Sequence, residues 1–367
     1  MDRRLGQADL FDLLGLEQLS SLALIGLGKN AGKTSVLNHL IRAFHEKPQG
    51  RSLALTSVGR DGEGRDLVTG GHKPRIFVHP GDLIATGRQS IPSCDAVLEI
   101  LELSGLHTAA GEVVLARAVT GGLVELAGPS LASDLKVCEK LFRRHDPSCL
   151  FLVDGALDRR SQAGGGLTQA LVLAAGMANA DSMDQLALQV ERQVLLLTLP
   201  ALDRELAEPV RELMDRRPKV RALALDGRGG IRSLLEADSL AGCGGQAAEA
   251  LEEGDRFLVL RGALTDRLIQ DLLTNGLPGG LTLVAEDGTR LFLSQESLDR
   301  LQGRGVQLAV LHRLALGMVS LNPMRRDGSL ADSAALLAAV RSRVKVPVLD
   351  LGPAPGFVTG QEGDETC

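Results

Sequence analysis

Hydrophobic residues along the chain fall into short continuous runs, separated by longer stretches in which apolar and polar positions follow a helical period. The short runs have the length and uniform apolar character of buried strands, and they lie at 22–26, 53–58, 150–153, 171–175 and 194–199. Helical periodicity predicts helices at 34–46 and 131–142. Because strands alternate with helices, we expect a mainly parallel sheet, with antiparallel strands added between 76 and 127.

The first apolar run leads directly into a glycine-containing turn, and Gly-Lys-Thr then opens the first long helical segment. Successive backbone N–H groups at such a turn, together with the helix N-terminus, form a site for phosphate oxygens. In this pattern Lys33 reaches the β- and γ-phosphates, and the Thr34 hydroxyl binds Mg²⁺. The predicted nucleotide-binding residues are Gly28, Lys29, Asn30, Ala31, Gly32, Lys33, Thr34 and Ser35.

This loop departs from the usual G-x-x-x-x-G-K-[ST] spacing, because Leu27 stands where the first glycine is expected. A left-handed backbone costs a non-glycine residue about 1–2 kcal/mol. Gly26 and Gly28 flank the position, so we expect a turn shifted by one residue. Lys29 is given a minor role, since its spacing to Lys33 is one residue shorter than in dimeric P-loop ATPases with a second lysine.

Acidic residues follow two of the predicted strands. The run 149–153 ends in Asp154 and has the form of a Walker B strand, whose carboxylate holds the water shell of Mg²⁺. The second strand leads into a loop that contains Asp61, Glu63 and Asp66. We expect that strand to lie beside the first one, so that Asp61 orients water or metal and acts with Lys33 as a catalytic residue.

We therefore predict an α/β fold with a P-loop NTPase-like, mainly parallel sheet, followed by a second, smaller α/β domain. The strand–helix alternation restarts after a charged stretch that ends at Pro218. On this basis the nucleotide-binding domain covers 1–200 and the second domain 201–350, and the Pro-, Gly- and acid-rich segment 351–367 is expected to be a disordered tail. No internal repeat is visible in the sequence.

Composition excludes several other classes of function. The chain has 40 Lys and Arg against 46 Asp and Glu, a net charge of −6, and neither Trp nor Tyr. An acidic chain without aromatic platforms is poorly suited to nucleic-acid binding. The five cysteines have no C-x-x-C spacing, which favours reduced thiols in a cytoplasmic protein. The longest apolar runs are far below the ~20 residues that span a bilayer, so no membrane segment is expected.

Three classes of function remain open from the residues alone. The chain can be an ATPase that acts as a chaperone on a partner enzyme, a kinase or ATP-dependent ligase similar to dethiobiotin synthetase, or a scaffold that binds nucleotide and barely hydrolyses it. The absence of an Asn/Thr-Lys-x-Asp signature after Asp154 favours ATP over GTP. No residue after Asp154 supplies an obvious catalytic base, so turnover is expected to be slow. A homodimer is also left open.

Several short segments resemble one family in the same order along the chain: 28–38, 56–63, 154–159, 262–266 and 319–323. Together they resemble the small reactivase subunits of lysine 5,6-aminomutase from lysine-fermenting bacteria. The resemblance implies ATP- and Mg²⁺-dependent reactivation of an adenosylcobalamin-dependent aminomutase, in which damaged cobalamin is exchanged for intact cofactor. It further implies two partners, the aminomutase itself and a larger mismatch-repair-like ATPase subunit.

Overall fold

The computed structural model describes residues 7–47, 50–59, 76–155 and 168–352. The described residues form two compact units. Unit 1 draws on three stretches of chain, within Met1–Leu157, Leu171–Leu188 and Gly317–Cys367, and unit 2 lies within Asp158–Ala170 and Gln189–Leu316. The chain therefore leaves unit 1 and later returns to it.

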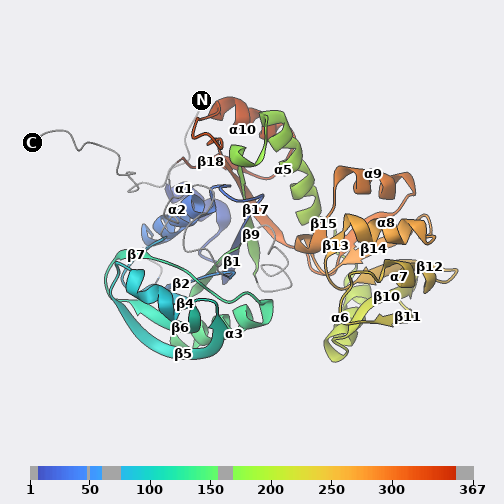
Figure 1. Cartoon of the computed structure of the whole chain (residues 1–367), viewed down its shortest axis with the longest axis horizontal. Helices are drawn as coiled ribbons and strands as arrows, with labels where there is room; N and C mark the ends of the chain where they lie inside the picture. The colour runs from blue at the N-terminus through green and yellow to red at the C-terminus, as the bar shows by residue number, and fades with distance from the viewer. Residues whose placement is uncertain (1–6, 48–49, 60–75, 156–167, 353–367) are drawn as a thin grey trace, which may run out of the picture. The chain divides into compact units, whose positions relative to one another are not determined.

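Unit 1 is built mainly from a nine-stranded sheet (Figure 1). Its elements before the departure to unit 2 are α1 (Gln7–Leu14), β1 (Ser21–Gly26), α2 (Lys33–His45), β2 (Leu53–Ser57), β3 (Ile76–Val78), β4 (Leu83–Gly87), η1 (Arg88–Ser93), β5 (Leu98–Thr108), β6 (Gly111–Ala118), β7 (Gly122–Val124), α3 (Ala132–His145), β8 (Leu150–Asp154), β9 (Ala170–Gly176) and η3 (Met177–Asn179). After the return come β17 (Ala315–Asn322), α10 (Ser333–Arg341) and β18 (Val348–Asp350).

The strand order of the large sheet is β18-β17-β9-β1-β8-β2-β4-β6-β5. The pairs β1–β8, β8–β2, β2–β4 and β17–β18 are parallel, and β4–β6 and β6–β5 are antiparallel. The expected α/β architecture, with antiparallel additions between 76 and 127, is confirmed. β1 lies well inside the sheet, and all its residues are buried because it is covered on both faces.

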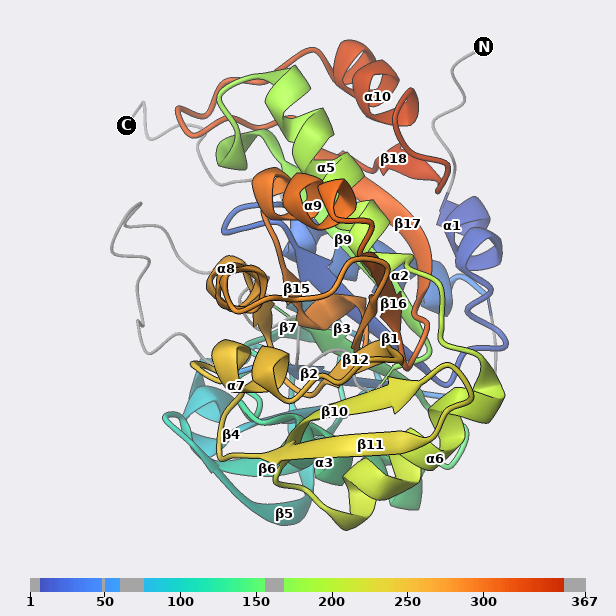
Figure 2. The same cartoon turned by 90° about the vertical axis from the view of Figure 1, so that its right-hand side faces the viewer.

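Unit 2 has its own five-stranded sheet, of order β11-β10-β12-β14-β16, in which β12, β14 and β16 are parallel and β10 and β11 antiparallel. Figure 2 shows β11 at the outer edge, next to β10. α5 (Met183–Leu197) begins within the residues of unit 1 and ends within those of unit 2. The further elements of unit 2 are α6 (Arg204–Arg216), β10 (Val220–Asp226), β11 (Ile231–Glu236), α7 (Gly244–Glu249), β12 (Asp255–Leu260), β13 (Leu264–Thr265), α8 (Asp266–Thr274), β14 (Thr282–Ala285), η4 (Gly288–Arg290), β15 (Leu291–Phe292), α9 (Gln295–Gly303) and β16 (Gln307–Val310).

Alternate residues of the second sheet face two separate hydrophobic cores. Leu258 and Leu260 of β12 belong to the core that contains residues of α7, α8 and α9. Val259, between them, belongs to the core that contains residues of α6. Since successive side chains of a strand point to opposite faces, helices cover both sides of this sheet and unit 2 has three layers.

A structural repeat within unit 2 was not visible in the sequence. β12 is followed by the short strand β13 and α8, and β14 is followed by the short strand β15 and α9. The two short strands pair in parallel, with Leu264 opposite Leu291. Each helix then begins at a hydroxyl-bearing cap, Thr265 for α8 and Ser294 for α9. The repeat lies in the order of the strands and helices, and its two copies share only a few residue types.

The division of the chain differs from the expected domains 1–200 and 201–350. β17 and β18 join the first sheet although they lie within 201–350, so the second unit is an insertion instead of a C-terminal half. The expected strand at 194–199 is wrong, because residues 194–197 form the last turn of the long helix α5 and the helix ends at Leu197. Leu195 is 53% exposed while Leu197 is 1% exposed, a difference that fits a helix face. The predicted tail lies almost wholly outside the described residues.

Four of the five cysteines lie in the described part of the chain. Among the described residues, Cys94, Cys138, Cys149 and Cys243 form no disulfide. Burial raises the pKa of the Cys138 thiol to about 12, so this thiol stays protonated and inert near neutral pH. Within the described residues, no helix has both the length and the apolar character needed to cross a bilayer.

Candidate functional site

The segment Gly26–Lys33, hereafter the glycine loop, connects β1 to α2. β1 pairs with β8 on one side and with β9 on the other. The backbone N–H of Leu27 donates to the Ala174 carbonyl of β9 over 2.9 Å, which extends the sheet by one residue past the end of β1. The loop therefore starts from a rigid, fully buried base.

The expected shift of the turn by one residue does not describe how the loop accommodates Leu27. Leu27 is not among the residues with positive φ, and the left-handed positions are Asn30, at φ 58°, and Gly32, at φ 95°. Asn30 is the one non-glycine residue with positive φ in the described part of the chain. Asparagine tolerates this conformation better than most side chains. Leu27 thus costs no left-handed strain, because it still belongs to the sheet.

Lys33 is the first residue of α2, and its side chain folds back over the loop. Its Nζ lies 3.3 Å from the Gly28 carbonyl oxygen. A Cβ at Gly26 would lie 3.0 Å from that Nζ and 3.1 Å from the Cδ of Lys33, which is tighter than ordinary packing. Gly26 is therefore the glycine that makes room for the lysine, and the ammonium group is held at the loop itself.

The N-terminus of α2 has no side-chain cap. Gly32 occupies the cap position and offers no side-chain acceptor to the first N–H groups of the helix. Thr34 and Ser35, which follow Lys33 in the first turn, are half-buried, and the Ser35 hydroxyl donates to the Gly352 carbonyl over 3.0 Å. Uncapped N–H groups and the positive end of the helix dipole together favour a negatively charged ligand here.

Asp154 ends β8, the strand beside β1. In register it lies opposite Leu24 of β1 and Ser57 of β2. Its backbone is fixed on both sides, because its carbonyl accepts from Val58 N–H over 2.7 Å and the following Gly155 N–H donates to Leu24 over 2.8 Å. Asp154 is half-buried, and it stands at the same edge of the sheet as the glycine loop.

The expected neighbour relation between β1 and β2 is wrong, since β8 lies between them. The end of β2 is therefore one strand further from the glycine loop than the sequence suggested, and the acidic strand end nearest to the loop is that of β8. Asp61, Glu63 and Asp66 lie outside the described residues, so their place relative to the loop is not part of the site described here.

Two asparagines complete the site, and sequence reasoning missed their role. The side-chain Nδ2 of Asn179, in η3 after β9, donates to the Lys29 carbonyl over 2.9 Å. The Nδ2 of Asn322, the last residue of β17, donates to the Asn30 carbonyl over 3.2 Å. The available signal was position: each asparagine directly follows an apolar run. Asn322 also falls in a segment that carried the family resemblance.

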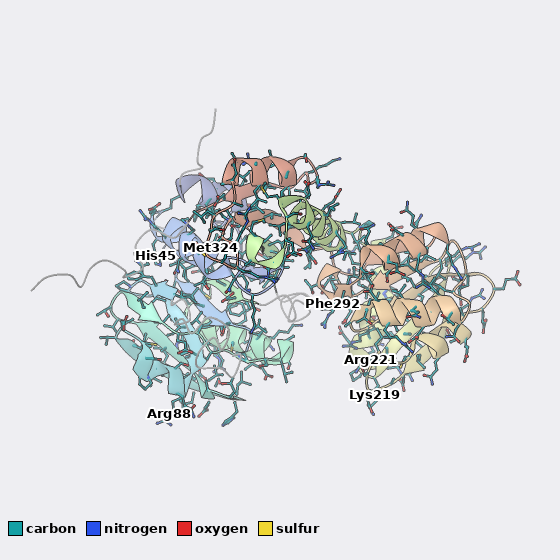
Figure 3. The ribbon with its side chains drawn as sticks, turned by 45° about the horizontal axis from the view of Figure 1, so that its top comes forward. His45, Arg88, Lys219, Arg221, Phe292 and Met324 are labelled. Carbon is teal, nitrogen blue, oxygen red and sulfur yellow. The ribbon has the colours of Figure 1, made fainter. Side chains whose placement is uncertain are left out.

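A second polar cluster lies at the other end of α2. His45, labelled in Figure 3, places its Nε2 2.9 Å from the Asp82 carboxylate, which is fully buried. The His79 ring stacks on His45 with centroids 4.2 Å apart. Burial, and next the neighbouring His45, lower the pKa of His79. No group of three or more His, Cys, Asp or Glu suited to a metal occurs in the described chain. Hydrogen bonds between His45 and Asp82 and the contact between the two imidazole rings hold this cluster together.

Comparison with protein-family models, with curated proteins and with solved structures finds no match to this chain. The site is therefore interpreted from its own residues.

Proposed function

We propose that this chain binds Mg²⁺-ATP at the glycine loop and hydrolyses it slowly, as a P-loop NTPase. The observation that carries the proposal is the fold-back of Lys33 over Gly26 at the start of an uncapped helix. A lysine in that place brings a full positive charge to a helix N-terminus that has no side-chain cap. Polyphosphate chains are the common ligands that satisfy such an arrangement.

The residues present fit a nucleotide and its metal ion. Lys33 would hold the β- and γ-phosphates, and the Thr34 hydroxyl would bind Mg²⁺. Asp154, at the end of the adjacent strand, would hold the water shell of the metal. A Mg²⁺ ion held by these residues would supply positive charge against the charge that develops on the transferred phosphoryl group. Lys29, which is exposed at the rim of the loop, keeps a minor role.

Slow turnover follows from what surrounds Asp154. The next residue is Gly155 instead of a glutamate, so the position beside the proposed metal ligand offers no general base. Asp61 remains the proposed residue for orienting the attacking water. Because water positioning acts in the transition state, Asp61→Asn is expected to lower kcat with little change in ATP affinity.

The first test is calorimetric titration of the whole chain with Mg²⁺-ATP. Lys33→Ala removes charge-assisted hydrogen bonds worth roughly 1.5–3 kcal/mol each, so binding should weaken about 100-fold. The matched control is Lys219→Ala, which removes an exposed lysine of unit 2 whose Nζ lies 3.4 Å from Asp238; its affinity should equal that of the wild type. Equal affinity of Lys33→Ala and wild type would overturn the nucleotide site.

We place this ATPase in the reactivation of an adenosylcobalamin-dependent aminomutase, on the strength of the resemblance to the small reactivase subunits. ATP binding would change the affinity of the chain for the inactivated aminomutase, and that enzyme would then bind its damaged cobalamin less tightly. A swing of a partner from 1:99 to 99:1 between two conformations needs about 5.5 kcal/mol. Mg²⁺ and several charge-assisted bonds to the γ-phosphate are of that order.

The corresponding experiment incubates inactivated lysine 5,6-aminomutase with this chain, a larger mismatch-repair-like ATPase subunit, Mg²⁺-ATP and fresh adenosylcobalamin. Activity should return with wild type and fail to return with Lys33→Ala. Return of activity without this chain, or no return at all, would refute the reactivase role. A kinase or ligase acting on a small molecule would then be the leading function for the same loop.

A further inference from the structure

The carbonyl groups of two consecutive loop residues are held by side chains from distant parts of unit 1. Asn179 binds the Lys29 carbonyl across 150 positions of sequence, and Asn322 binds the Asn30 carbonyl across 292. Both partners are backbone groups of exposed residues, which water would otherwise solvate. The contacts therefore fix the direction of the carbonyls and are not needed to satisfy buried polar groups.

The direction of these carbonyls decides whether the loop can bind an anion. A peptide unit points its N–H and its carbonyl in opposite directions, so a loop that presents N–H groups to phosphate must turn its carbonyl oxygens away. Carbonyls turned inward would repel phosphate oxygens. Asn179 and Asn322 pull two adjacent carbonyls toward β9 and β17, away from the interior of the loop, and Asn30 adopts its left-handed backbone between them.

The glycines of the loop make room for these asparagines. A Cβ at Gly28 would lie 2.4 Å from the Nδ2 of Asn179, and a Cβ at Gly32 would lie 3.1 Å from the Cβ of Asn322. Gly176, the last residue of β9, is also required, because a Cβ there would lie 3.0 Å from the Asn30 carbonyl oxygen. Close approach between the loop and the ends of β9 and β17 thus explains glycines that phosphate binding alone does not.

The two asparagines are also tied to one another. The Oδ1 of Asn322 accepts from the Met324 N–H over 3.1 Å, which fixes the amide so that its Nδ2 faces the loop. Arg326 then donates from its Nε to the Ala178 carbonyl over 2.7 Å, next to Asn179. The segment after β17 and the segment after β9 are therefore held as one support behind the loop.

We infer that Asn179 and Asn322 are positioning residues that keep the glycine loop in its phosphate-binding conformation before the nucleotide arrives. This inference rests on the proposed function of the loop as a Mg²⁺-ATP site. The two residues act on the loop through its carbonyls, so they increase affinity for the polyphosphate chain and have no preference for the base. Preorganisation of this kind lowers the ordering cost of binding.

The test uses Asn179→Leu and Asn322→Leu, which keep the branched shape of asparagine and remove the N–H donor. Calorimetry of the full chain with Mg²⁺-ATP and with Mg²⁺-tripolyphosphate should show about threefold to tenfold weaker binding for each variant. The loss should be the same for both ligands. The matched control is Asn275→Leu, whose Nδ2 donates to a backbone carbonyl of α8 in unit 2, Asp271, over 2.8 Å; its affinities should not change.

A second measurement separates positioning from a general loss of stability. Hydrogen exchange of the ligand-free protein should be faster at the amides of Gly28–Gly32 in both Asn→Leu variants, and the midpoint of thermal unfolding should match that of Asn275→Leu. An affinity loss accompanied by a similar loss of exchange protection throughout unit 1 would reduce the two asparagines to ordinary structural residues, and would overturn the inference.

The possible outcomes also distinguish this inference from the proposed function. If wild type binds neither ligand, the nucleotide site itself is refuted. If wild type binds and the variants bind equally well, only the positioning role is refuted. If Asn322→Leu weakens ATP and leaves tripolyphosphate unchanged, Asn322 contacts the nucleoside, and the positioning role is again overturned.

Discussion

The glycine loop of unit 1 and the segments before α8 and α9 of unit 2 all follow parallel strands, but the helices after them begin in different ways. In unit 1 the loop after β1 leads into α2, whose N-terminus has no side-chain cap. In unit 2 the helices after β12 and β14 are both capped: Thr265 accepts from Leu268 N–H over 3.4 Å, and Ser294 accepts from Ser297 N–H over 3.3 Å. A side-chain hydroxyl therefore already binds one backbone donor at the start of each of these two helices.

The loop after β14 in unit 2 is closed by its own side chains. The Asp287 carboxylate is fully buried and accepts from the Thr289 N–H over 2.8 Å and from the Thr289 hydroxyl. Gly288 packs directly against the backbone of α5, where a Cβ would lie 2.3 Å from the Leu196 carbonyl oxygen. By contrast, the glycine loop of unit 1 is supported by two neutral amides, and the helix that follows it has no side-chain cap.

A parallel sheet does not by itself make a ligand site. Ligands do tend to bind beyond the carboxyl ends of parallel strands, but the residues of each loop decide whether backbone donors remain for them. Glycine at a cap position leaves the donors available, and Ser, Thr or Asp occupies them. The start of α2 follows the first pattern, and the starts of α8 and α9 follow the second.

The largest expected effect is a difference in the loss of stability between two glycine substitutions, one at Gly288 in unit 2 and one at Gly28 in the glycine loop. Gly288→Ala forces a Cβ against backbone, which cannot rotate away, so the free energy of unfolding should fall by about 3 kcal/mol. Gly28→Ala meets the side-chain Nδ2 of Asn179 at 2.4 Å, and that side chain can rotate, so its loss should be about 1 kcal/mol. Denaturant unfolding measures both values.

Nucleotide binding should respond in the reverse order. Gly28→Ala displaces Asn179 and should weaken Mg²⁺-ATP binding, whereas folded Gly288→Ala should bind like wild type. Equal stability losses in the two variants would show that the two loops are packed alike, and the comparison would fail.

An intermediate effect is expected from the helix caps. Ser294→Ala removes the cap of α9 and should lower the free energy of unfolding by about 1 kcal/mol, with Mg²⁺-ATP affinity unchanged. Ser35→Ala is the counterpart in the first turn of α2, where the hydroxyl donates to an exposed carbonyl at Gly352, and the loss there should stay within about 0.5 kcal/mol. Thermal unfolding of the two variants measures both losses of stability. A larger loss for Ser35→Ala than for Ser294→Ala would contradict the expected order.

The smallest expected effect is on the pH dependence of local stability. A carboxylate supports the start of α9 in unit 2, whereas neutral amides support the glycine loop of unit 1. Burial alone raises the pKa of Asp266, but hydrogen bonds from Ser297 and Ser294 outweigh it, and the pKa lies below its usual value. A lowered carboxyl pKa stabilises the fold above about pH 3.9 and loses that contribution as pH falls through the folded-state pKa.

Hydrogen exchange between about pH 5 and pH 3 tests this sign across the range of carboxyl titration. Protection at 294–298 should fall as pH is lowered. Protection at 28–32 in the ligand-free protein should change less, since Asn179 and Asn322 do not titrate. Asp266→Asn should remove most of the pH dependence at 294–298, and a steeper loss at the glycine loop than at α9 would contradict the difference between the two supports.

Local signals in the sequence predicted much of unit 1. The apolar run, the glycines and Gly-Lys-Thr fixed β1, the glycine loop and the start of α2, and the run ending in Asp154 fixed β8. These features depend on neighbouring residues, because strand and helix periods and glycine conformation act over a few positions. The helical end of α5 was misread because a short apolar run has the same appearance in a buried helix and in a strand.

Only the tertiary structure decided which distant segments meet at the loop. It placed β8 between β1 and β2, returned β17 and β18 to the first sheet after the whole of unit 2, and brought Asn179 and Asn322 to consecutive carbonyls of the loop. An asparagine after a strand has the same local appearance whether it faces solvent or a loop. Its partner is set by strand order, which depends on how all the strands pack together and not on any one stretch of the chain.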